Sequence, residues 1–418
     1  FTQYFKNRLY YIDVKGMLSS LHGSAGAITA LQNSVAHYYQ RASSADYLGV
    51  DPTRRSLTGT GGYVKVGRKG NAKWNFSETF TWSSPGFDLN DMGYMKETDY
   101  LMNETEIMYR QTDIWKIFRY NAFTLSQKNM WNYGGTPFSN NASLRWQSMT
   151  MNRYEWDVKE TFAWNWLDSR LLRGGPDVRF GSYFLTSAKF NTDKAKRMMF
   201  MLKYEGDHNF EGNRFNTISP SLTFRLGNHV YLSGQLDYAW NTDEMQYVAT
   251  TSPLSSSSLT PYYYVMGHMD QKTYGLTLKL QVNVTPDISI QFYGAPFTSI
   301  AKYDDFKLAA DTKSHTFENR FQRIDPDHLT YADGVYTIGE GAGQMPFRNP
   351  DFRFNEFRSN LVARWEYLPG STLYFVWEHR MSNRDNWYSS GWGSNLDRMW
   401  GLPATNTFMI KMNYWFNL

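Results

Sequence analysis

The sequence predicts an all-β fold: a transmembrane antiparallel β-barrel of about 16–18 strands that occupies residues 1–418. Three observations favour it. Apolar and polar side chains alternate with a period of two, successive hairpins combine short turns with long loops, and aromatic residues make up 17% of the chain. In membrane barrels, lipid-facing and lumen-facing residues alternate, and aromatic girdles flank the apolar band. We therefore expect long extracellular loops and short periplasmic turns.

The alternation is clear at the end of the chain, where residues 407–418 read T-F-M-I-K-M-N-Y-W-F-N-L. Every second residue from Phe408 to Leu418 is apolar or aromatic, and the residues between them are mostly polar. Because side chains alternate between the faces of a strand, this pattern predicts a strand with one apolar face. A tilted membrane-crossing strand needs roughly 9–11 residues, so we expect this segment to close the barrel.

The first half of the chain predicts strands and one short helix. Period-two segments at residues 10–16, 57–68 and 72–83 predict strands, and residues 69–71 predict a tight turn. Residues 24–34 depart from period two and predict a helix with Ile28 and Leu31 on one side. Further strands are expected at residues 116–127, 143–154, 156–166, 177–190 and 197–205.

The second half contains well-defined hairpins and one long irregular segment. Tight turns are predicted at residues 227–228, 285–287 and 368–370. Residues 303–350 form the longest irregular segment, and Asp333-Gly334 suggests a small hairpin within it. Because membrane barrels carry long loops outside and short turns in the periplasm, we expect residues 303–350 outside the cell and the turns inside.

Charged residues concentrate on one face of the hairpin at residues 354–377 and just beyond it. They occupy the phase opposite to Leu361, Trp365, Phe375 and Trp377. A charge at the midplane of the lipid costs about 2–4 kcal/mol, so we expect this face to line the barrel interior. The predicted lumen-lining charges are Arg358, Arg364, Glu366, Glu378 and Arg380.

Composition excludes several other classes. The mean hydropathy is −0.57. The sequence contains no run of about 18 apolar residues, so we expect no transmembrane helix. A net charge of +4 without blocks of like charge gives little support to nucleic-acid binding. The absence of cysteine excludes disulfides and thiolate metal sites. An exported barrel needs a signal peptide and none is present, so we expect a mature or partial chain.

Two segments share a motif with a glutamate in the middle of an apolar face. Residues 74–82 read W-N-F-S-E-T-F-T-W, and residues 156–164 read W-D-V-K-E-T-F-A-W. Regular alternation would place Glu78 and Glu160 near the centre of the lipid band, at a cost in free energy. A hydrogen bond from a neighbouring strand or another protein would relieve this cost, and protonation of the carboxylate would also relieve it. A bulge that turns the carboxylate inward is the plainer alternative.

No catalytic constellation stands out, and we expect no enzyme activity, cofactor or metal. Neither G-x-S-x-G nor H-E-x-x-H occurs. Asp88, Asn90 and Asp91 have oxygen-ligand spacing, as do Asp325 and Asp327, but turn capping is the favoured role for both groups. We interpret the adjacent pair Asp207-His208 as part of a solvated loop, although hydrolases also use Asp and His.

Four phrases together resemble a known family: G-S-A-G-A-I-T-A-L-Q-N-S at residues 23–34, S-P-G-F-D-L-N-D-M-G-Y at 84–94, R-G-G-P at 173–176, and F-R-S-N-L-V-A-R-W-E-Y-L-P-G-S-T-L-Y-F-V-W at 357–377. They are similar to Bacteroidota outer-membrane proteins whose N-terminal domain resembles the family-9 carbohydrate-binding modules and whose C-terminal barrel domain is uncharacterised. The resemblance spans most of this chain and implies location and fold more than activity. No segment here matches the sugar-binding domain.

Together these observations predict an integral protein of the bacterial outer membrane. It would act as a pore or transport component, or as a scaffold subunit of a cell-envelope complex. The alternatives are an outer-membrane surface hydrolase and a soluble β-rich binding protein. The expected partners are outer-membrane lipid and, as an open alternative, other outer-membrane proteins or lipoproteins, which Glu78 and Glu160 could contact. Nucleic acid is not an expected partner.

Overall fold

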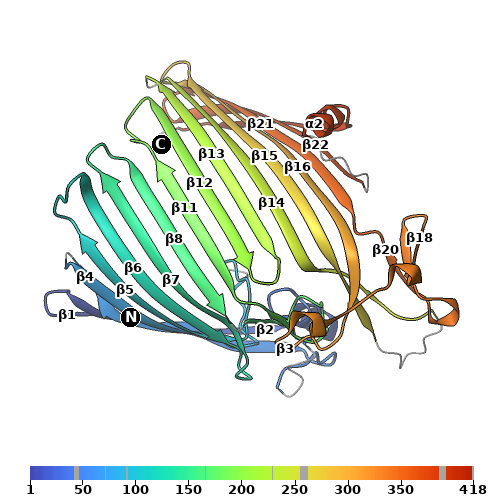
Figure 1. Ribbon diagram of the computed structural model, residues 1–418. Helices are drawn as coiled ribbons and strands as arrows, with labels where there is room; N and C mark the ends of the chain where they lie inside the picture. The colour runs from blue at the N-terminus through green and yellow to red at the C-terminus, as the bar shows by residue number, and fades with distance from the viewer. Residues whose placement is uncertain are drawn as a thin grey trace.

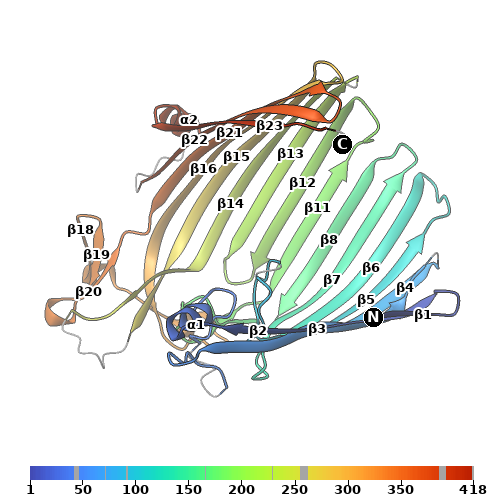
Figure 2. The same ribbon diagram turned by 180° about the vertical axis from the view of Figure 1, so that it is seen from behind.

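A single large sheet dominates the structure. The computed structural model describes residues 1–41, 47–70, 72–90, 93–164, 166–227, 229–254, 262–385 and 392–416. Most regular structure in this part of the chain is strand, which confirms the all-β class. Figures 1 and 2 show a curved sheet of oblique strands, with most of the loops and small elements gathered at one end.

The strands follow the chain order. The first half forms β1 (Thr2–Phe5), β2 (Tyr10–His22), β3 (Ser56–Arg68), β4 (Trp74–Ser83), β5 (Tyr100–Gln111), β6 (Phe118–Trp131), β7 (Pro137–Thr150) and β8 (Glu155–Trp164). The second half forms β11 (Tyr183–Asn191), β12 (Met198–Asn209), β13 (Arg214–Leu226), β14 (Val230–Thr251), β15 (Tyr263–Asn283), β16 (Ile288–Ala309), β21 (Phe352–Leu368), β22 (Ser371–Asp385) and β23 (Ala404–Asn413). The smaller elements are β9 (Trp166–Asp168), β10 (Val178–Phe180), β17 (Phe321–Arg323), β18 (Leu329–Ala332), β19 (Val335–Ile338), β20 (Met345–Arg348), α1 (Ala25–Gln32) and α2 (Trp392–Trp400).

The sheet has 18 strands, all paired antiparallel, within the expected range. Each strand pairs with the next from β1 to β8, β8 pairs with β11, and the order continues through β16, β21, β22 and β23. β17 extends the far end of β16. The sheet is open: β1 and β23 are its edges and do not pair with each other, so the expected closed barrel is not observed in the described residues.

The two ends of the sheet carry different connections. At the turn end the connections are short, at residues 6–9, 69–73, 112–117, 151–154, 192–197, 227–229, 284–287 and 369–370. At the loop end they are mostly longer, at residues 23–55, 84–99, 132–136, 165–182, 210–213, 252–262, 310–351 and 386–403. All the predicted tight turns fall at the turn end, although Asn71 and Asn228 lie outside the described residues.

The strand register gives the sheet one apolar and one polar face. The apolar face is defined by a row of side chains directly opposite one another across six strands, Leu232, Leu280, Phe292, Leu361, Trp377 and Phe408. The polar face lies on the other side and is formed by the residues adjacent to these on each strand. One of its rows contains Ser233, Lys279, Tyr293, Asn360, Glu378 and Thr407.

The last strand follows the two-faced pattern, but its bounds differ from the predicted ones. β23 begins earlier than predicted and ends at Asn413, while Tyr414 and Phe416 continue beyond the strand. Phe408 and Ile410 are 64% and 72% exposed because one edge of β23 has no neighbouring strand. Leu418, the outermost residue of the predicted strand, lies outside the described residues.

Helix α1 confirms the one helix predicted from the sequence. Ser24 caps it, with its Oγ accepting a hydrogen bond from the Ala27 N–H at 3.2 Å. Ile28 is buried with Tyr39 and Leu57, and Leu31 packs against this cluster. Neither α1 nor α2 has the length and hydropathy of a membrane-spanning helix.

The long segment differs from its prediction at its start. Residues 303–309 belong to β16, because β14, β15 and β16 extend past their neighbours at the loop end. The small hairpin is confirmed: β18 and β19 pair across Asp333 and Gly334, which both have positive φ. β20 completes a three-stranded sheet, and its Phe347 packs with Phe306 of β16 in a hydrophobic cluster.

Candidate functional site

The five predicted charges share the polar face. The register places Arg358 opposite Arg380, Arg364 opposite Tyr374, and Glu378 opposite Asn360. All five therefore lie on the side opposite to Leu361 and Trp377. That this side faces a barrel interior remains a prediction, because the sheet is open.

A carboxylate that sequence reasoning missed organises this group. Glu356 is 15% exposed and lies between two arginines, with its Oε1 2.9 Å from Arg358 and 3.0 Å from Arg380. Both arginines are more than half exposed, so these ion pairs orient the side chains more than they stabilise the sheet. Further along β21, towards the turn end, Arg364 pairs with Glu366 at 2.5 Å. The arrangement leaves two cationic groups accessible from the polar face.

A groove runs along the polar face further towards the N-terminus. It has a volume of about 580 Å³ and is lined by residues from β5 to β13, including Lys128, Lys159 and Glu205. Ser126 and Ser143 form a hydrogen bond of 2.7 Å within it. Its mixed hydroxyl and charged lining suits water and hydrated solutes.

Glu78 and Glu160 lie on the apolar face, and each has a polar partner on the next strand. Thr105 Oγ1 donates to Glu78 at 2.5 Å, and Thr186 Oγ1 donates to Glu160 at 2.7 Å. No register shift occurs where β4, β5, β8 and β11 pair, so the bulge alternative is wrong here. The hydrogen bond from a neighbouring strand is confirmed, and contact with another protein remains a prediction.

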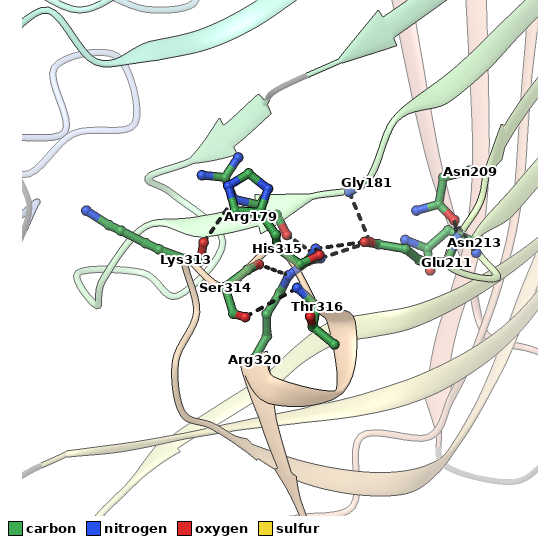
Figure 3. Close-up of polar contacts among 10 residues, drawn as sticks. All are labelled: Arg179, Gly181, Asn209, Glu211, Asn213, Lys313, Ser314, His315, Thr316 and Arg320. Atoms are coloured by element: carbon green, nitrogen blue, oxygen red, sulfur yellow. Dashed lines mark hydrogen bonds and ion pairs between the residues drawn. The ribbon is translucent and has the colours of Figure 1, made fainter.

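At the loop end, Arg320 joins three segments that are distant in sequence (Figure 3). Its side chain is 1% exposed and forms a two-pronged ion pair with Glu211, at 2.8 and 2.9 Å. The remaining guanidinium hydrogens bind the carbonyls of Arg179, Ser314 and His315. These contacts satisfy the buried charge and tie residues 310–320 to β10 and to the β12–β13 turn.

The partner Glu211 is also positioned closely. Its Oε2 accepts the Gly181 N–H at 3.0 Å, and its own N–H donates to Asn209 Oδ1 at 2.9 Å. A Cβ at Gly181 would lie 2.5 Å from Glu211 Cδ, so a larger residue there would push the carboxylate out of its present position. Sequence reasoning could not find this cluster, because Arg320 and Glu211 are 109 residues apart and belong to no motif.

A second polar cluster lies under the loops that precede β5. Arg41 pairs with Asp99 at 2.7 Å, and both side chains are almost fully buried. Tyr47 donates to the same carboxylate at 2.7 Å. Burial raises the pKa of Asp99 above its usual value, although Tyr47 and Arg41 oppose the shift. The pair lines a cavity of about 290 Å³ together with the Glu97–Arg170 ion pair.

The remaining candidates are structural. Asp88 and Asp325 cap turns, since their carboxylates accept the N–H groups of Asn90 and Asp327 at 2.7 and 3.0 Å. Asp91 lies outside the described residues, and no metal-binding group of His, Asp and Glu was found among those that are described. The loop interpretation of Asp207-His208 is wrong. Both residues belong to β12, where successive side chains point to opposite faces.

Comparisons with known proteins give a family and a distant structural likeness. Residues 23–418 match a family profile described as a domain of unknown function, DUF5916. No curated protein sequence matches the chain. Among solved structures, the siderophore receptor PirA from Acinetobacter baumannii has a TM-score of 0.38 and 9% sequence identity, covering 98% of this chain and 69% of that one.

Proposed function

Since the chain belongs to the DUF5916 family, whose function is not known, we propose its role from its physical chemistry. The sheet forms the wall of an outer-membrane β-barrel that serves as a pore or transport component. It performs no catalysis of its own. This reading keeps the polar face towards the lumen and the apolar face towards lipid.

The observation that carries the proposal is the pair of continuous faces. The apolar row crosses β14, β15, β16, β21, β22 and β23 without a charged residue. A soluble sheet would cover such a face with a second layer, whereas lipid can cover it directly. The polar face carries Arg358, Glu356 and Arg380, which require water or paired charges. Connections of unequal length at the two ends also fit a membrane barrel.

Conductance across a lipid bilayer tests the proposal. Purified full-length protein, inserted into planar bilayers, should produce discrete ion currents. Replacing both Arg358 and Arg380 by Glu should shift the reversal potential towards cation selectivity, because two cationic groups become anionic. Arg323→Glu is the matched control, since Arg323 is 77% exposed in β17 at the loop end of the sheet. Folded, inserted protein that gives no current would reject the pore function.

A scaffold role is the second candidate, and the small sheet β18–β20 favours it. This sheet lies at the loop end, where it packs against the extended end of β16 (Figure 1). Its Tyr331 is 55% exposed, and its ring is tilted against that of Tyr336 with 4.6 Å between the ring centroids. Exposed aromatic side chains of this kind are common at protein interfaces. Co-purification of a specific envelope protein that is lost after Tyr331→Ser would support this role over the pore.

A further inference from the structure

We propose that helix α2 is an interfacial anchor that lies in the lipid headgroup layer, outside the barrel wall at its loop end. The inference rests on the proposed membrane location and deepens it. It assigns the lipid surface as the partner of an element that no sequence pattern suggested. Three structural features support this assignment: the face on which α2 packs, its distance from the opposite rim, and the side chains that it exposes.

The contacts of Trp400 show on which face of the sheet α2 packs. The ring of Trp400 lies 4.8 Å from Phe357 in an edge-on contact. Phe357 is opposite Pro296 and Met381, in the same phase as Leu361 and Trp377, and therefore lies on the apolar face. Helix α2 thus covers the side that is proposed to meet lipid, and not the lumen.

Polar contacts fix the helix to the same side. The Asn395 side chain is buried and accepts a hydrogen bond from Arg353 Nη1 at 3.4 Å. Arg353 also pairs with Asp385, which lies 3.7 Å from Arg398. Arg353 and Asp385 are opposite each other in register, in the same phase as Phe357. Met399 is fully buried beneath the helix.

The length of β21 gives the height of α2 above the turn end. From Phe357 to Trp365, β21 advances by 365 − 357 = 8 residues. At about 3.3 Å per residue this is roughly 26 Å along the strand. With a tilt of 35–45° the height is roughly 20 Å, close to the apolar band of about 25 Å in outer-membrane barrels. Since Trp365 and Tyr367 make an edge-on contact near the turn end, α2 lies at the opposite edge of the band.

The exposed side of α2 carries both aromatic and polar residues. Trp400 is 54% exposed, while Gly393, Ser394, Asp397 and Arg398 are also exposed. This mixture is too polar for the acyl core, but it suits the headgroup layer, where tryptophan is enriched and arginine reaches phosphate groups. The continuity of α2 with the apolar face selects lipid, and not a protein, as the occupant.

The absence of native cysteine allows a direct test. A single cysteine replaces Asp397, and carries an environment-sensitive fluorophore in protein reconstituted into phosphatidylcholine–phosphatidylglycerol vesicles. Leu278→Cys on the apolar face and Tyr331→Cys on β18 are the references. Quenchers are placed on the lipid near the headgroup, on the lipid near the chain end, and in the water as iodide.

The probe at position 397 should be quenched most by the shallow lipid quencher, position 278 by the deep quencher, and position 331 by iodide alone. If position 397 behaves like position 331, α2 lies in water and the inference is wrong. If position 278 also escapes both lipid quenchers, the membrane proposal itself fails. Protection of position 397 from every quencher in native outer membrane would assign a protein to this surface and overturn the lipid assignment.

Discussion

Arg320 illustrates how single residues hold the loop end of the sheet. Its guanidinium is buried and satisfied by Glu211 and three backbone carbonyls. Removing one partner of a buried ion pair leaves a charge without compensation, at a typical cost of about 3–5 kcal/mol. Arg320→Met should therefore release residues 310–320 to protease and lower the unfolding midpoint.

A matched control is available at the opposite end. Lys73 and Asp113 form an ion pair at 3.1 Å, but both side chains are more than half exposed. Lys73→Met should leave unfolding and proteolysis unchanged, because exposed pairs contribute little. Equal protease sensitivity in the two variants would contradict the role assigned to Arg320.

A variant of Thr105 tests whether a hydrogen bond stabilises the Glu78 carboxylate on the apolar face. Thr105→Val removes the donor to Glu78 while keeping the side-chain shape. If this face meets lipid as proposed, no water replaces that donor, so we expect a loss of about 1–3 kcal/mol in unfolding free energy measured in vesicles. The double variant Thr105→Val with Glu78→Leu should recover most of it. Thr79→Val, on the polar face, is the control, and a loss of equal size there would refute the explanation.

His37 supplies a pH dependence at the loop end. Its ring is fully buried, 3.7 Å from Asp88, and burial lowers its pKa below 6.5, although Asp88 opposes this. The unfolded state then binds the proton more readily than the folded state. Stability contributed by neutral His37 is complete above pH 6.5 and is lost as the pH falls towards the folded-state pKa.

The measurement is protection of residues 23–55 from hydrogen exchange between pH 7.5 and 5. Protection should fall on acidification in the native chain, and fall less in His37→Gln, which cannot take up the proton. An identical decline in the two proteins would show that another group is responsible.

At the scale of elements, period and turn chemistry predicted most hairpins but not their lengths. Leu278 and Ile290 lie on the predicted face, and α1 follows the loss of period two. β5 was missed because Glu104, Glu106 and Arg110 on its polar face gave it the composition of a loop. The extra length of β14–β16 and the position of α2 depend on contacts with residues 321–347 and with β21, which no local pattern encodes.

The unequal connections at the two ends of the sheet predict its orientation in the membrane. Protease added to intact cells should cleave within residues 310–351 and spare the turns at 284–287 and 369–370, because long loops lie outside. Permeabilised cells provide the control in which periplasmic turns become accessible to the enzyme. Cleavage at the turns of intact cells, with residues 310–351 protected, would reverse the orientation.

At the scale of the whole molecule, the directions of the edge strands limit how the sheet can close. Without β17, the line from β1 to β23 contains 18 − 1 = 17 strands that alternate in direction. β1 and β23 therefore run the same way and cannot form an antiparallel pair. Antiparallel closure requires an odd number of further strands between them, or displacement of β1 so that β23 meets β2. In either case the sheet keeps one apolar and one polar face, as a barrel wall does.

The orientation of that wall is tested by adjacent residues of β15. Leu278 belongs to the apolar face between Gly234 and Gly294, and Thr277 belongs to the polar face. Leu278→Arg should lower the stability of the inserted protein by about 2–4 kcal/mol, the cost of a cation near the midplane of an outer-membrane barrel. Thr277→Arg should change it little, because its side chain reaches water. Leu278→Ala separates the lost packing from the charge. Unfolding by guanidinium in lipid vesicles gives all three values, and equal tolerance of arginine at both positions would mean that neither face meets lipid.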